Sequence, residues 1–245
     1  MAKKSGLGNL LLYNGVDISG DVSAVSISTP REVLDVTGIS KSALERINGL
    51  SDASIEASIF FNDASSQAHL TLRGLPTTDV IVAWAMGTTV GDACAFLTAK
   101  QMNYDWSRGA DGSLAGTVNS QLSSGTNLEY GNLLSAGLVT ASSAASIASR
   151  DDGASTSNGA AAFLMIADIN SGSPTVKVQE SSNNSSWSDL INFSTVADGA
   201  EPSAERLSMS GSVARYLRIT TTGTFSNCKF AVGIRRGTSV DDTSY

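Results

Sequence analysis

The feature that most constrains the fold is a two-residue alternation of apolar and polar side chains over residues 52–62. One side of an extended chain would carry Ala53, Ile55, Ala57, Ile59 and Phe61. The other side would carry Ser54, Glu56, Ser58 and Phe60. A period of two is typical of a β-strand with one buried face and one mostly hydrated face. Residues 114–122 follow the same pattern, with Leu114, Val118 and Leu122 on one face and Thr117, Asn119 and Gln121 opposite.

Further short apolar runs, separated by turn residues, predict a mainly β chain. The first half contains an Asn-Gly hairpin signal within residues 10–18 and two more strands at 79–86 and 93–106. In the second half the runs are 160–169, 175–180, 188–193, 206–209, 215–221 and 229–235. Short strands at this spacing favour an antiparallel sandwich.

One helix is predicted, over residues 62–74. Asn62 or Asp63 would cap it, and Gly74 and Pro76 would end it. The residues that would share its buried face are Ala64, Ala68 and Leu72. Residues 30–50 show no sustained alternation and are interpreted as a loop, of a length that is usually functional or reaches toward a partner.

A tract rich in Ser, Ala and Gly at residues 135–149 divides the chain. Such tracts form connections or weak edge strands rather than cores. The sequence therefore predicts two domains, 1–135 and 136–245.

The composition argues against several classes of function. There are 16 Lys and Arg against 23 Asp and Glu, a net charge of −7, which argues against tight binding to a phosphate backbone. A single histidine excludes most hydrolase and metal-site designs. No apolar run approaches the roughly 20 residues that span a bilayer, and the start resembles no signal peptide. Two widely separated cysteines favour synthesis in a reducing cytosol.

Individual reactive residues have simple structural interpretations. His69 fits a half-buried helix position, and Cys94 and Cys228 fit small buried apolar positions rather than nucleophiles. The pairs at 151–152 and 241–242 are adjacent aspartates, which point to opposite faces of an extended chain. We expect no catalytic set, no metal site and no cofactor.

Two aromatic residues of the second half are candidates for stacking on a sugar ring, namely Trp187 and Tyr216. Arg215 and Arg218 flank Tyr216 and would suit a carboxylate or a sugar. The alternative is that both rings pack in the sandwich.

The order and spacing of several motifs in residues 8–137 resemble major tail tube proteins of long-tailed, non-contractile (siphovirus-type) phages, particularly those infecting actinobacteria. The motifs are residues 13–17 (YNGVD), 35–38 (DVTG), 49–55 (GLSDASI), 73–80 (RGLPTTDV), 101–104 (QMNY), 109–114 (GADGSL) and 128–131 (LEYG). Tyr130 is a departure, because Trp is commoner there. The second half looks like an appended sandwich of related tail and decoration proteins.

The resemblance implies a tail-tube β-sandwich or half-barrel with one flanking helix, followed by a second antiparallel sandwich. It implies six copies closing into a ring, and rings stacking into the tube through which double-stranded DNA passes. The implied partners are further copies of the chain, a tape measure protein and the tail terminator and distal tail proteins, with no membrane insertion. The implied location is the virion tail, assembled in the host cytoplasm, without enzymatic activity.

Within that resemblance, the alternating strands give candidates for the channel lining: Ser54, Glu56, Ser58, Thr117, Asn119 and Gln121. An ordinary hydrated outer face is the alternative. Residues 1–9 and the loop at 30–50 would contact neighbouring copies, with candidate residues Arg31, Glu32, Asp35, Lys41, Glu45 and Arg46. The alternative function is a decoration or carbohydrate-binding adhesion protein of the virion surface, with Trp187 and Tyr216 as contacts.

Overall fold

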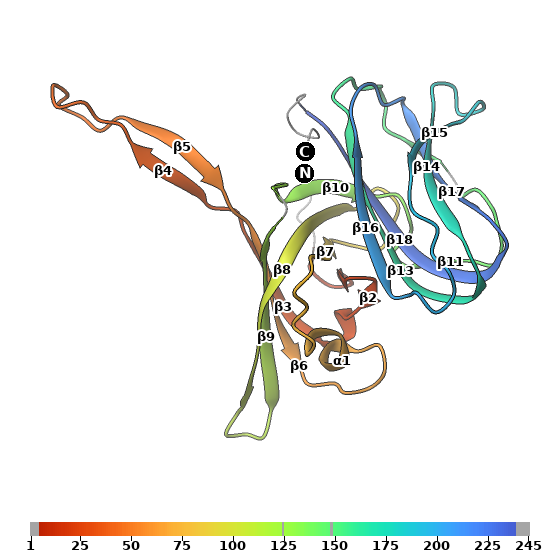
Figure 1. Cartoon of the computed structure of the whole chain (residues 1–245), viewed down its shortest axis with the longest axis horizontal. Helices are drawn as coiled ribbons and strands as arrows, with labels where there is room; N and C mark the ends of the chain where they lie inside the picture. The colour runs from red at the N-terminus through yellow and green to blue at the C-terminus, as the bar shows by residue number, and fades with distance from the viewer. Residues whose placement is uncertain (1–4, 124, 148, 239–245) are drawn as a thin grey trace.

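The computed structural model describes residues 5–123, 125–147 and 149–238, and it is mainly β, as the sequence predicts. Within these residues the strands form a 12-stranded, a four-stranded and a two-stranded sheet, all with antiparallel pairing. Figure 1 shows two β layers in the second half, a curved sheet in the first half and one hairpin that projects away from the body.

The first half supplies most of the curved sheet. Its strands are β1 (Leu10–Tyr13), β2 (Val16–Asp17), β3 (Val22–Ser28), β6 (Ser54–Phe60), β7 (Val80–Ala85), β8 (Ala93–Arg108), β9 (Leu114–Leu122) and β10 (Glu129–Leu133). The β1–β2 turn confirms the Asn-Gly prediction, because Asn14 and Gly15 both have positive φ, 47° and 96°. Gly15 also lies against the backbone of Ile166, where a Cβ atom would come within 2.7 Å of the carbonyl oxygen.

Strand β8 belongs to two parts of the sheet. Residues 94–99 pair with β7, while residues 99–108 pair with β9. The register shifts between Gln101 and Asn103, where β8 passes from one part to the other.

The helix is shorter than the sequence predicts. Helix α1 is Ala68–Leu72, so Ala64 lies outside it and neither Asn62 nor Asp63 caps it, although Ala68 and Leu72 are buried as expected. The Ala68 N–H donates instead to the Asp21 carboxylate at 2.9 Å, from the 3-10 turn η1 (Ser19–Asp21). The helix N-terminus is therefore capped by a carboxylate 47 residues away in the sequence and not by a neighbouring side chain. No helix among the described residues is long and apolar enough to cross a membrane.

The segment predicted to be a loop is a hairpin, and that prediction is wrong. Strands β4 (Arg31–Asp35) and β5 (Arg46–Ser51) form the two-stranded sheet, called the arm from here on (residues 31–51). Figure 1 shows the arm in orange, reaching away from every other element. A register shift between Arg31 and Val33 interrupts the alternation, which explains why no period of two is visible in the sequence.

The second half forms a sandwich. Its strands are β11 (Val139–Ala141), β12 (Arg150–Asp151), β13 (Ala160–Gly172), β14 (Thr175–Ser181), β15 (Ser188–Asn192), β16 (Ser203–Met209), β17 (Tyr216–Thr222) and β18 (Phe225–Arg236). All six predicted runs are confirmed as strands, while β11 and β12 are additions. The sheet order β12–β17–β14–β15 forms one layer, and an apolar core including Val178, Ile219 and Phe230 fills the space to the other.

The two halves share both a sheet and a core. Strand β10 pairs with β8 on one side and β18 on the other, which joins them in one sheet. Phe96 and Phe163 meet with ring centroids 4.9 Å apart in a core cluster drawn from both halves. The Arg206 guanidinium donates to both oxygens of Glu129, at 2.9 and 2.8 Å, with only 10% and 4% of these side chains exposed. The boundary near residue 136 stays a prediction.

Candidate assembly surface

The six channel candidates lie on one face of the sheet. Strands β6 and β9 pair so that three cross-strand pairs follow one another, namely Ser54 with Gln121, Glu56 with Asn119 and Ser58 with Thr117. Alternate residues of an antiparallel pair point to the same side, so these side chains form a continuous polar face. Glu56 is exposed, and the other five are partly exposed.

The opposite face of the same strands is buried. Ile55, Ala57, Ile59 and Val118 are almost fully buried in the core of the first half. Phe61 departs from the prediction, because it lies beyond the end of β6 and is 40% exposed. Its ring packs against the imidazole ring of His69, with the two ring centroids 4.6 Å apart.

The polar face continues onto strands that sequence reasoning left out. On β3, Ser26 lies opposite Glu56. On β8, Asn103 lies opposite Asn119 and Asp105 lies opposite Thr117. The sequence pattern does not show that Asn103 and Asp105 belong to this face. The bulge in β8 shifts the register, so residues after it point to the opposite side from the one that simple alternation predicts.

The net charge of this face is slightly negative. Glu56 and Asp105 contribute carboxylates, whereas the Lys100 ammonium is paired with Asp79 at 2.9 Å. That ion pair, with a further hydrogen bond from Ser123, lowers the pKa of Asp79 below its ordinary value. The face therefore offers no cluster of unpaired cations to a nucleic acid.

Both outer edges of the four-stranded part β3–β6–β9–β8 lack a strand partner among the described residues. Strand β3 pairs with β6 alone, and residues 100–108 of β8 pair with β9 alone. Free backbone N–H and C=O groups along an edge are a template for pairing with another chain. The sheet is thus open on two sides that differ in sequence.

The arm carries all six predicted contact residues, and each of them is exposed. Lys41 and Glu45 form an ion pair at 2.8 Å, and Asp35 lies opposite Arg46 in the register. Two hydrogen bonds from Thr37 lower the pKa of Asp35.

The arm is also unusually apolar for an exposed element. Its exposed large apolar side chains are Val33, Leu34, Val36, Ile39, Leu44, Ile47 and Leu50. A single two-stranded hairpin has no second layer to cover such residues. Residues 1–4 of the predicted N-terminal contact segment lie outside the described residues.

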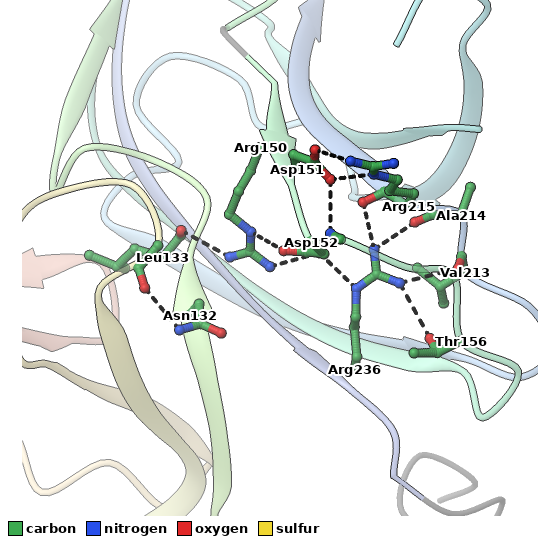
Figure 2. A network of polar contacts seen from close by, with 12 residues as sticks. Asn132, Leu133, Arg150, Asp151, Asp152, Thr156, Val213, Ala214, Arg215 and Arg236 are labelled. Carbon is green, nitrogen blue, oxygen red and sulfur yellow. Dashed lines mark hydrogen bonds and ion pairs between the residues drawn. The ribbon is translucent and has the colours of Figure 1, made fainter. Parts of the chain in front are cut away.

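The adjacent aspartates 151 and 152 are held by arginines, as Figure 2 shows. The Asp152 carboxylate accepts hydrogen bonds from Arg150 at 2.6 and 3.0 Å and from Arg236 at 2.7 Å. Asp151 accepts two from Arg215, both at 2.6 Å. Arg150 also donates to the carbonyl oxygen of Leu133 at 3.3 Å, which ties this network to β10.

Both carboxylates therefore accept their hydrogen bonds from arginine guanidinium groups. Among the described residues, no group of three or more acidic, His or Cys side chains is placed to hold a metal ion. Residues 241–242, the other predicted pair, lie outside the described part of the chain.

The remaining reactive residues lie in apolar surroundings. Burial raises the pKa of the thiols of Cys94 and Cys228 to about 12, so both are neutral thiols at physiological pH. Nδ1 of His69 lies 3.0 Å from the Tyr104 hydroxyl, within a cluster of aromatic rings.

Trp187 and Tyr216 are both half-buried, and each has one ring face against an arginine. The guanidinium carbon of Arg218 lies 4.2 Å from the Trp187 ring centroid, and that of Arg215 lies 4.9 Å from the Tyr216 centroid. Tyr216 and Arg218 are two residues apart on β17 and share its outer face. A sugar would have to stack on the uncovered side of either ring.

No family model matches the chain, and no curated protein matches it. Among solved structures, it is similar to a chain in the virion of a native gene transfer agent particle, with 15% identity, a TM-score of 0.38, and coverage of 51% of this chain and 98% of that one. It is also similar to a chain in the tail of an empty gene transfer agent particle with C6 symmetry, with 17% identity, a TM-score of 0.37, and coverage of 46% and 91%. A third is the Dit protein of phage SPP1, described as a hub of the adsorption apparatus, with 11% identity, a TM-score of 0.31, and coverage of 93% and 98%.

Proposed function

We propose that the chain is a virion structural protein that assembles as stacked hexameric rings into the tail tube of a long-tailed phage. The observation that carries the proposal is the four-stranded part β3–β6–β9–β8. It combines an uncovered polar face, a closed apolar face and two unpaired edges. Six is the number of copies that the sequence resemblance implies.

Ring closure would join the two open edges. Strand β3 of one copy would lie along residues 100–108 of β8 in the next copy, which extends the sheet from subunit to subunit. Closing a sheet into a barrel removes every unpaired edge and satisfies its backbone groups. The ring should therefore be more stable than the free subunit.

The polar face would line the channel. In a ring, Glu56 and Asp105 are repeated once in every copy and give bands of negative charge. A polar, weakly anionic wall repels phosphates and lets double-stranded DNA pass without being held. The proposed partners are those that the sequence resemblance implies: further copies of the chain, a tape measure protein, and the tail terminator and distal tail proteins. We place the protein in the virion tail, assembled in the host cytoplasm.

The deciding experiment is negative-stain electron microscopy of the purified full-length chain at increasing concentration. Rings or tubes with a central channel are the expected result. A protein that stays monomeric at high concentration would contradict the tube and favour a decoration or binding protein.

For the second half, we propose a module on the outside of the tube that contacts carbohydrate. The supporting observation is the pairing of Trp187 with Arg218, and of Tyr216 with Arg215, on the outer side of the sandwich. The test is a glycan array with the full-length chain and its Trp187→Ala variant. Tyr130→Ala serves as the control, because Tyr130 is an exposed aromatic on β10. Binding that is lost only in Trp187→Ala would support the module, and a flat array would leave a spacer role.

A further inference from the structure

A cavity of about 450 Å³ lies at the base of the arm, where the two halves of the chain meet. The charged residues of its wall are Arg31 and Asp52 at the base of the arm, Glu129 on β10, Arg206 on β16 and Arg235 on β18. A volume of this size is within the range of ligand-binding sites in proteins. Three parts of the fold therefore surround one space that is large enough for a ligand.

The charge of this wall is opposite to that of the whole chain. Arg206 donates to both oxygens of Glu129, and Nη1 of Arg235 lies 3.9 Å from the same carboxylate. The side chains of these three residues are between 4% and 18% exposed. With Arg31 and Asp52, three guanidinium groups and two carboxylates line the cavity, whereas the chain has a net charge of −7. A surplus of positive charge in a partly dehydrated space favours an anionic group.

The wall also carries a buried hydroxyl group. Thr126 is 7% exposed, and its Oγ1 atom has no hydrogen-bond partner among the described residues. Buried hydroxyl groups are usually hydrogen-bonded, so this one indicates a place for a further acceptor. A carboxylate in the cavity would supply both the negative charge and the acceptor.

The segment after Thr238 has the matching charge and can reach the cavity. Residues 239–245 (SVDDTSY) contain two adjacent aspartates, Asp241 and Asp242. They lie outside the described residues, but Arg235, only six residues before Asp241, is part of the cavity wall. Six residues at about 3.4 Å each span up to roughly 20 Å. The chain can therefore bring these carboxylates to its own cavity.

We propose that residues 239–245 bind in this cavity of their own chain, with the carboxylate of Asp241 or Asp242 beside Arg31 and the Thr126 hydroxyl. The bound segment would connect the base of the arm, β10 and the sandwich through ion pairs and a hydrogen bond. Binding would take place in the free subunit, so it does not depend on the proposed tube.

Disulfide capture in dispersed, full-length subunits tests this binding. Asn127→Cys places a thiol on the cavity wall, and Thr243→Cys places one beside the two aspartates. Both natural cysteines are buried, which limits the background. The expected result after oxidation is an internal disulfide in the monomer, detected by mass and on a non-reducing gel. Thr29→Cys, exposed on the same wall, is the second choice if Asn127→Cys does not fold.

The control pair is Ser157→Cys with Thr243→Cys. The Gly237 N–H donates to the carbonyl oxygen of Gly159 at 2.9 Å, so the exposed Ser157 lies close to the start of the segment. A segment without a preferred site would meet Ser157 at least as often as the cavity wall. Equal yields from the two pairs would therefore overturn the proposal. A disulfide between two chains would also overturn it, because the segment in the cavity would then belong to a second copy.

Substitutions in the wall test the chemistry of recognition, with the internal disulfide brought to equilibrium in a glutathione buffer. Arg31→Gln should lower the equilibrium constant, and so should added salt. Arg108→Gln, the same change in charge at the exposed end of β8, should not. Thr126→Val should lower it by about tenfold, because a hydrogen bond to a charged group is lost. An Arg31→Gln effect no larger than that of Arg108→Gln, or no effect of Thr126→Val, would contradict the proposed contacts.

Discussion

The arm and the C-terminal sandwich are both antiparallel β structure that contains large apolar residues, but these residues are exposed in the arm and buried in the sandwich. In the sandwich, Val176, Ile219 and Phe230 are completely buried between two sheets. In the arm, Leu34 and Ile47 face solvent, because no second layer lies against them. Both regions form strands, but only in the sandwich does a second sheet of the same chain cover the apolar side chains.

The polar groups show the same difference. The Asp152 carboxylate of the sandwich is shared by two arginines and only 15% exposed, whereas the Lys41–Glu45 pair of the arm is about half exposed. Exposed ion pairs contribute little to stability because water already solvates both charges. The charged and apolar groups of the sandwich are therefore satisfied within one chain, whereas those of the arm are exposed to solvent.

The largest expected effect follows from removing the arm. Deletion of residues 31–49 should abolish tube formation while leaving a folded monomer, because the hydrogen bond that closes the base of the arm, from Asp52 to Pro30, is retained. Circular dichroism checks the fold, and electron microscopy checks assembly. A deletion of the exposed turn at 183–186 in the sandwich is the control. Normal tubes from the arm deletion would show that the arm is dispensable.

A substitution in the shared core should lower the free energy of unfolding far more than a substitution in the arm. Phe163→Ala removes a fully buried ring that contacts Phe96 across the two halves, and should lower the free energy of unfolding by about 3–5 kcal/mol. Ile47→Ala in the arm should change it by less than about 0.5 kcal/mol in the free monomer. Urea unfolding measures both. Because the core is shared, one cooperative transition is expected, and two separate transitions would contradict the shared core.

Much of this fold was predictable because local patterns specify local structure. The alternation over residues 52–62 predicts β6, and the one over residues 114–122 predicts β9. Together they place the six polar candidates on one face, and the Asn14-Gly15 turn predicts the first hairpin. The six short runs of the second half are all strands. In each case the signal lies within one element, so no knowledge of its neighbours is needed.

The rest depended on contacts between distant residues. The cap of α1 comes from Asp21, so the helix start at Ala68 has no local signal. The register shifts in the arm and in β8 break the period of two where it would have been informative. Alternation also shows which side chains share a face, but not whether that face meets solvent, DNA or another copy, which is why the channel lining stays a proposal.

A charge reversal on the polar face should affect DNA passage rather than stability. Glu56→Lys should leave the fold and the tube intact, because the side chain is exposed, but should slow or block genome ejection by placing a ring of cations in the channel. The effect should be strongest at low salt, where screening is weak. Asp198→Lys, an equal change in charge on an exposed turn of the sandwich, is the control. Equal ejection kinetics of the two variants at low ionic strength would show that Glu56 does not line the channel.

The smallest expected effect compares one carboxylate from each region. Two hydrogen bonds from Arg215, with a further one from the Gly153 N–H, lower the pKa of Asp151 from 3.8 to about 2. A lowered pKa means that the folded state favours the charged form, so the stabilisation is present above pH 3.8 and is lost as the pH falls toward 2.

Asp151→Asn should therefore lower the Tm slightly at neutral pH, and the difference from wild type should shrink between pH 3.8 and about 2. Asp35→Asn in the arm removes a carboxylate whose pKa is also lowered, by Thr37. It should leave the Tm unchanged at every pH, because the arm packs against no core in the free monomer and its opening is not part of global unfolding. An Asp35→Asn variant with the larger loss of Tm would mean that the arm, and not only the sandwich, is part of the cooperative unit.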